Sequence, residues 1–140
     1  MLWTFKPDFE LKLLFDDTLY LAGYNIVSTG GGNLGLLFHW YTVHVPRADY
    51  QLFIHVVDTQ TGQMLGQIDE PLSKGTHPTT TWNSNEIVFE TVTLPPNLAY
   101  GNACHCKLEM GLYQLKDGTR AFIKDDGQHP VGDHVDETIQ

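Results

Sequence analysis

The strongest constraint on the fold is a nine-residue stretch, Tyr50–Asp58, which contains no Gly or Pro and is rich in β-branched and aromatic side chains. Turn-forming residues bound it, Pro46–Asp49 before it and Thr59–Gly62 after it, which is typical of a strand between turns. The two-residue period of a strand puts alternate side chains on opposite faces. One face carries Leu52, Ile54 and Val56, and the other carries Phe53, His55 and Val57. Because both faces are largely apolar, we predict a central strand covered on both sides.

Similar segments recur along the chain with turn-rich links between them. They are Phe9–Phe15, Leu19–Val27, Leu34–Val45, Tyr50–Asp58, Met64–Asp69, Glu86–Leu94, Cys104–Gln114 and Ala121–Lys124. No segment repeats apolar residues at helical spacing over three turns, so no substantial helix is expected. The pattern predicts one all-β domain over residues 1–124, an antiparallel β-sandwich of jelly-roll or immunoglobulin-like type with about eight strands. Residues 125–140 are polar and acidic, and we expect them to form a frayed tail.

Charge and hydropathy exclude several kinds of partner. The net charge of −9 argues against nucleic acid, whose phosphates need a basic patch, and against docking on an anionic membrane surface. No run of 18 apolar residues is present, so no transmembrane segment is expected. Residues Met1–Asp8 lack the apolar core of a signal peptide. These observations leave the cellular location open.

The two cysteines, Cys104 and Cys106, are separated by one residue. Side chains two apart on a regular strand point the same way, which does not provide the usual disulfide geometry. We therefore expect two small buried thiols rather than a disulfide scaffold. A metal hook that includes His105 is also disfavoured, because His105 would lie on the opposite face of the strand.

Several short motifs occur in an order that resembles a known family, the β-sandwich accessory domain at the C-terminus of some bacterial membrane glycosyltransferases of the dolichyl-phosphate-mannose-mannosyltransferase type. The motifs span about 100 residues, Leu19–Arg120. They are Leu21–Tyr24, Leu36–Trp40, Asp49–Asp58, Asp69–Leu72, Gly75–Trp82 and Gly111–Tyr113. The Cys104–His105–Cys106 segment and the His-containing acidic tail depart from the family pattern.

The resemblance implies a sandwich fold and an extracytoplasmic, carbohydrate-related setting. In that family the catalytic residues lie in the membrane part, so the resemblance implies no catalysis by this chain. The sequence itself contains no Gly-x-Ser-x-Gly nucleophile elbow and no phosphate-binding Gly-x-x-x-x-Gly-Lys loop.

The long polar connection after Asp69 is the candidate glycan-binding segment. An aromatic face covers the apolar side of a pyranose, while hydroxyls and carboxylates bind its OH groups. The candidate ligand-binding residues are His77, Thr79, Thr81 and Trp82, with the carboxylates of Asp69 and Glu70. In the alternative interpretation Trp82 is a core plug and the threonines satisfy loop backbone groups. Trp40, in a predicted central strand, is expected in the core.

Metal-binding patterns are weak in this sequence. A Ca²⁺ site between strand ends would use Asp16, Asp17, Asp58 and Asp69, but no contiguous calcium-binding loop is present. The seven histidines form no pair at ligand spacing on one element. A site assembled across strands from His55, His105 and a carboxylate stays as a further hypothesis. No other cofactor is expected.

Three functions remain as hypotheses. The first is a non-catalytic carbohydrate-binding-like or accessory module with a glycan partner. The second is a structural or assembly domain that forms homo-oligomeric contacts. The third is a metal-dependent enzyme with a histidine site between the sheets.

Overall fold

The computed structural model of the chain describes residues 6–75, 77–100 and 104–139. Six strands form one antiparallel sheet in the spatial order β6-β3-β2-β1-β8-β9. Their bounds are β1 (Phe9–Phe15), β2 (Leu19–Gly30), β3 (Asn33–Thr42), β6 (Ile87–Thr93), β8 (Ile123–Lys124) and β9 (Pro130–Gly132).

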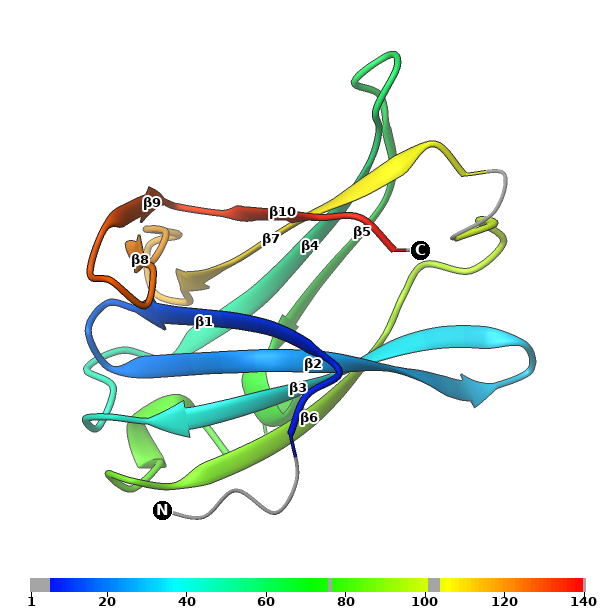
Figure 1. Cartoon of the computed structure of the whole chain (residues 1–140). Helices are drawn as coiled ribbons and strands as arrows, with labels where there is room; N and C mark the ends of the chain where they lie inside the picture. Colours follow the sequence, from blue (N-terminus) through cyan, green and yellow to red (C-terminus); the bar gives the residue numbers. More distant parts are fainter. Residues whose placement is uncertain (1–5, 76, 101–103, 140) are drawn as a thin grey trace.

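A second antiparallel sheet has four strands in the order β10-β7-β4-β5. Its members are β4 (Tyr50–Asp58), β5 (Met64–Pro71), β7 (Cys106–Gln114) and β10 (Val135–Glu137). The two sheets form the layers of a sandwich (Figure 1). The predicted all-β antiparallel sandwich is therefore confirmed, with ten strands in the described part of the chain instead of about eight.

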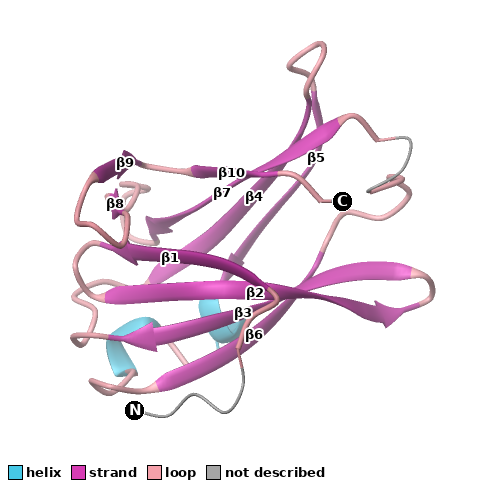
Figure 2. Cartoon of the chain, in the orientation of Figure 1, coloured by secondary structure: helices cyan, strands magenta, loops and turns pink. Residues whose placement is uncertain are grey.

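Helical structure is limited to two short 3₁₀ turns, η1 (Leu72–Gly75) and η2 (Thr79–Thr81) (Figure 2). Both lie in the connection from β5 to β6, which carries the chain from the four-stranded sheet back to the six-stranded sheet. The expectation of no substantial helix is confirmed for the described residues. None of their helical segments is long and apolar enough to cross a membrane.

The core lies between the sheets and is built from alternate residues of each strand. Phe38 and Trp40 of β3 are fully buried, as predicted for Trp40, and the Trp40 ring meets Phe15 edge-on with centroids 5.4 Å apart. From the opposite sheet, the β4 residues Leu52, Ile54 and Val56 are buried against this layer. Each such side chain contributes about 1.5–3 kcal/mol when it is removed from water, so the two inner faces hold the sandwich together.

The predicted central strand is found as β4, with the predicted bounds and with neighbours on both edges. Within the described residues, no further sheet packs on its second face. Phe53 on that face is buried because the Arg120 guanidinium lies over its ring at 4.4 Å and the Tyr113 ring lies 6.3 Å away. The sequence pattern predicted a second covering layer on this face. The side chains of Arg120 and Tyr113 cover Phe53 instead.

The C-terminal residues do not fray as their composition suggested. Residues 130–132 extend the six-stranded sheet as β9, and residues 135–137 pair with β7 as β10. The backbone passes from one sheet to the other just after Gly132, whose φ of +127° favours glycine. The Tyr24 hydroxyl donates to the Glu137 carboxylate at 2.8 Å, which connects the two sheets beside the crossing. Val135 packs against the core and Ile139 is buried, so these two apolar side chains and the Tyr24–Glu137 hydrogen bond anchor this segment.

The cysteine prediction was wrong, because Cys104 and Cys106 form a disulfide. The geometric objection assumed that both residues lie on a regular strand. β7 begins only at Cys106, so Cys104 belongs to the preceding loop and its side chain can turn toward its partner. The bridge thus lies at the point where the chain enters β7.

Gly111 gives a test of the packing on the outer surface of the four-stranded sheet. A Cβ atom at this position would lie 2.6 Å from the Phe53 ring and 2.8 Å from the Asp133 carbonyl oxygen. We expect Gly111→Ala to lower the free energy of unfolding by about 1–3 kcal/mol, measured by urea denaturation.

The matched control for Gly111→Ala is Thr91→Ala at an exposed position of β6, which should change stability by less than about 0.5 kcal/mol. Because Phe53→Leu removes the ring atoms involved, the double variant with Gly111→Ala should lose less than the sum of the single variants. Strict additivity would contradict the proposed contact.

Candidate functional site

Trp82, the aromatic residue of the predicted glycan site, lies inside the sandwich. Its side chain is 1% exposed, and its indole N–H donates to the His77 carbonyl at 2.7 Å. The His77 ring stacks on the indole with centroids 6.1 Å apart. The indole face is therefore unable to receive a sugar, and Trp82 acts as the core plug of the alternative interpretation.

The threonines of the same connection satisfy local polar groups. The buried Thr79 hydroxyl donates to the Ala48 carbonyl at 2.7 Å and accepts from the Tyr50 N–H at 3.1 Å. The Thr81 hydroxyl donates to the Pro78 carbonyl at 2.6 Å. The Thr79 bonds fix the connection to the start of β4, and the Thr81 bond closes the η2 turn at an exposed position.

His77 also contacts Glu86, the residue that precedes β6 at the end of this connection. The His77 Nε2 atom lies 3.4 Å from a Glu86 carboxylate oxygen, and the Asn83 N–H donates to the other oxygen at 2.9 Å. The Asn83 N–H, with a smaller effect from His77, lowers the pKa of Glu86. His77 thus belongs to a loop-fixing network.

The two predicted carboxylates, Asp69 and Glu70, are not brought together with this loop. Asp69 is exposed on the outer surface of the four-stranded sheet, opposite Phe53. Burial and the nearby Asp69 raise the pKa of Tyr113. Glu70 is the next residue of β5, so its side chain points to the other face. The six predicted residues therefore do not converge on one surface.

The aspartates of the predicted calcium site are also far apart. Asp16 accepts from the Tyr50 hydroxyl and from the Phe122 N–H at the start of β4. Asp58 lies at the other end of β4, roughly 26 Å along the strand at 3.3 Å per residue, and accepts from two N–H groups of its own turn, which lower its pKa. Asp17 pairs with Lys124 at 2.8 Å. Each has a structural role.

The histidines predicted to share a metal do not meet either. His55 lies opposite Glu109 on the outer surface of the four-stranded sheet, and His105 is four residues before Glu109, roughly 13 Å along the strand direction. Among the described residues only His39 is a fully buried histidine, and it faces outward because Phe38 and Trp40 point into the core. Burial lowers the pKa of His39.

One end of the sandwich contains two adjoining hollows, which we call the end groove. The turn after β1, the loop from β3 to β4, η2 and the loop after β7 surround it, at the left of Figure 1. The hollows measure about 290 and 390 Å³. Both include Arg47, Ala48 and Lys116, and the remaining lining residues are Asp16, Asp17, Asp49, Tyr50, Thr80, Gln114, Leu115 and Phe122.

The cations of the end groove are available to a ligand. Within the described residues, neither Arg47 nor Lys116 forms an ion pair, whereas Lys107, Arg120 and Lys124 all do. The Phe122 side chain at the edge of the groove is 44% exposed. The groove therefore combines two cations outside ion pairs, the carboxylates of Asp16, Asp17 and Asp49, and a partly exposed aromatic ring, with the Lys124 ammonium 6.0 Å from the ring centroid.

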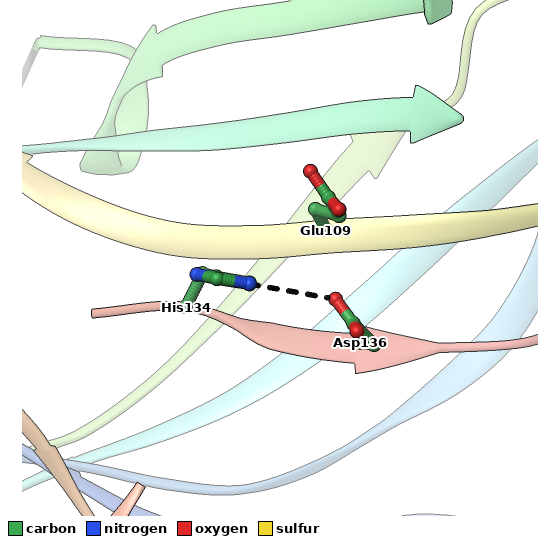
Figure 3. Close-up of side chains that lie close together, drawn as sticks. All are labelled: Glu109, His134 and Asp136. Atoms are coloured by element: carbon green, nitrogen blue, oxygen red, sulfur yellow. Dashed lines mark ion pairs between the residues drawn. The ribbon is translucent and has the colours of Figure 1, made fainter. Parts of the chain in front are cut away.

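A second polar group lies on the outer surface of the four-stranded sheet. Glu109 of β7, Asp136 of β10 and His134 just before β10 bring three ligand atoms within 4.8 Å of one another (Figure 3). The hydrogen bond with His134, and to a smaller degree the charge of Arg120, lower the pKa of Asp133 next to this group. It is the only set of three potential metal ligands of this kind among the residues that the structure describes.

Sequence reasoning missed both arrangements. The end groove is assembled from four separate loops, and no local pattern marks Arg47 or Lys116. The second group left only a weak signal, because His134 and Asp136 are two residues apart and flank an apolar residue, Val135, while Glu137 breaks the polar/apolar alternation. No protein-family model, curated protein or solved structure matches this chain.

Trp82→Phe tests the structural role of the indole. The change removes a buried N–H donor and leaves the His77 carbonyl without this partner, so we expect the unfolding free energy to fall by about 1–3 kcal/mol. Chemical denaturation followed by circular dichroism measures the loss. Thr80→Ala in the exposed part of the same connection serves as the control, with a smaller loss expected because its bonds to Asp49 are exposed to solvent. An unchanged stability for Trp82→Phe would contradict the assignment.

Proposed function

We propose that this protein is a non-catalytic β-sandwich module that binds carbohydrate in the end groove. The observation that carries the proposal is the combination of Arg47 and Lys116, without ion-pair partners in the described chain, with the exposed Phe122 ring around two hollows. Hollows near 300–400 Å³ are at the small end of ligand sites. A ligand of one or two sugar units fits that size.

Arg47 and Lys116 give the groove two cationic anchors for an acidic sugar. The carboxylates of the lining are engaged elsewhere, Asp16 with Tyr50, Asp17 with Lys124 and Asp49 with Thr80, whereas neither cation forms an ion pair within the described residues. A guanidinium binds a carboxylate through two parallel hydrogen bonds, and an ammonium adds a further donor. Phe122 supplies an apolar surface for the ring, and Gln114 supplies an amide. A uronic acid offers the matching carboxylate, hydroxyls and ring face.

Two further observations support an extracytoplasmic, carbohydrate-related setting for this protein. The ordered motifs from Leu19 to Arg120 resemble accessory domains of membrane glycosyltransferases, whose substrates are sugars. The Cys104–Cys106 disulfide favours an oxidising compartment, because such bonds persist outside the reducing cytosol. An extracytoplasmic accessory module is the function consistent with both.

An NMR titration with neutral and uronic-acid-containing oligosaccharides tests this function. We expect the acidic sugars to shift the backbone signals of residues 47–49, 114–116 and 122, and to leave the Trp82 indole signal in place. Arg47→Ala with Lys116→Ala should weaken binding about tenfold or more, because charge-assisted hydrogen bonds are lost.

Lys12→Ala is the matched control for the loss of charge, because Lys12 lies on β1 outside the groove and pairs with Glu10. Its sugar affinity should equal that of the unmodified protein. An absence of shifts with every saccharide, or shifts centred away from the groove, would refute the proposal.

The second candidate function is assembly with other copies of the chain through β6. This strand is an edge of the six-stranded sheet, and its residues Ile87 and Phe89 are 38% and 49% exposed. Exposed edge strands with apolar side chains are templates for pairing.

Light scattering coupled to size-exclusion chromatography tests assembly. If β6 pairs between copies, the protein elutes as a defined oligomer and Phe89→Glu converts it to a monomer, while Thr91→Glu, which also faces outward, has a smaller effect. A monomer at every concentration would exclude this function and leave the glycan-binding proposal in place.

A further inference from the structure

The outer surface of the four-stranded sheet carries a polar group that the proposed function does not use. Asp136 of β10 lies directly opposite Glu109 of β7 in the antiparallel register. His134 is two residues before Asp136, so both side chains lie on the same surface (Figure 3). Val135 between them packs against the core. The fold thus places an imidazole and two carboxylates on one surface.

A fourth residue orients the imidazole. The Nδ1 atom of His134 lies 2.9 Å from an Asp133 carboxylate oxygen, and Asp133 is in turn 3.5 Å from Arg120. An ionised carboxylate only accepts hydrogen bonds, so Nδ1 carries a hydrogen. The Nε2 atom, 3.8 Å from Asp136, is the ring nitrogen that can bind a metal ion. A carboxylate on the second nitrogen is the arrangement that commonly orients metal-bound histidines.

The three potential ligand atoms are all electron-pair donors when His134 is neutral. The Nε2 lone pair and the two carboxylates then face one another, and either a second proton on the ring or a cation between them relieves their repulsion. Lys107 supplies part of that charge, with its ammonium 3.4 Å from Glu109 and 3.3 Å from Asp136. Its bond to Asp136 uses the Oδ2 atom, whereas the Oδ1 atom faces His134. Asp136 Oδ1 and His134 Nε2 therefore still face each other and can bind one ion between them.

The one imidazole nitrogen and two carboxylate oxygens of this group indicate which metal ion it would bind. Calcium and magnesium prefer oxygen ligands, whereas imidazole together with carboxylates suits zinc and its neighbours. Three protein ligands with a fourth position left to water is a common zinc arrangement. At bond lengths near 2.1 Å the ligand atoms lie about 3.4 Å apart, so the side chains must close inward by about 1.5 Å, which their partial exposure permits.

We propose that Glu109, His134 and Asp136 form a binding site for a late first-row divalent metal ion, with Asp133 as the positioning residue and Lys107 as a competing cation. The site is independent of the end groove. Zn²⁺ alone is the probe.

Isothermal titration of the untagged, chelator-treated protein with ZnCl₂ tests the site. We expect one bound ion per chain, and a shift of the His134 ring signals in NMR spectra when zinc is added. His134→Gln should weaken binding by more than roughly a hundredfold and Asp133→Asn by about tenfold. His129→Gln is the matched control, because His129 also pairs with an aspartate, Asp125 at 3.3 Å, but belongs to no three-ligand group among the described residues.

Lys107→Met separates a metal site from a simple ion-pair network. If the ammonium competes with the metal, its removal tightens zinc binding by roughly fivefold, because the repulsion between the two cations is lost. If His134→Gln fails to fold, Glu109→Gln takes its place, because it should also weaken zinc binding. Weaker binding by Lys107→Met, an equal loss in His129→Gln, or no zinc binding by the unmodified protein would each overturn the proposal.

Discussion

The contact between the inner faces of the two sheets is the interaction on which the rest of the structure depends. Trp40 and Phe38 from one sheet and Ile54 and Val56 from the other are withdrawn from water together. Neither sheet can bury these side chains alone, since an isolated antiparallel sheet leaves one face wet. Once the faces meet, the loops at the ends of the strands are held in place, and the end groove is a result of that arrangement.

The same constraint explains why the long connection between β5 and β6 is structural. A chain that passes from one sheet to the other must close the side of the sandwich, and Trp82 fills that side while Thr79 bonds the start of β4. A large aromatic residue next to hydroxyls is compatible with either a sugar site or a plug. Only the position of the indole relative to the core distinguishes the two, and that position depends on tertiary packing.

The sequence predicted well where a local pattern has one physical outcome. The Tyr50–Asp58 strand and the absence of long helices follow from side-chain periodicity and turn residues, which act over a few positions. Prediction failed where the structure depends on contacts between residues that are far apart in the sequence. The composition of residues 125–140 indicated a solvated tail, yet pairing with Leu108, Glu109 and Met110 gives three of them strand structure. Arg47 and Lys116 meet only because separate loops share one end of the sandwich, and the Cys104–Cys106 bridge depends on where β7 begins.

The hydrogen bond from Tyr24 to Glu137 joins residues 113 positions apart in the sequence. A structure held together by such distant pairs must close large loops before the contacts that stabilise them form, and loop closure carries an entropic cost. Sandwiches of this kind fold in milliseconds to seconds, more slowly than helical bundles of similar size. During that interval the edges of the unfinished sheets are open to other chains, so slow closure exposes this protein to aggregation when it is made at high concentration.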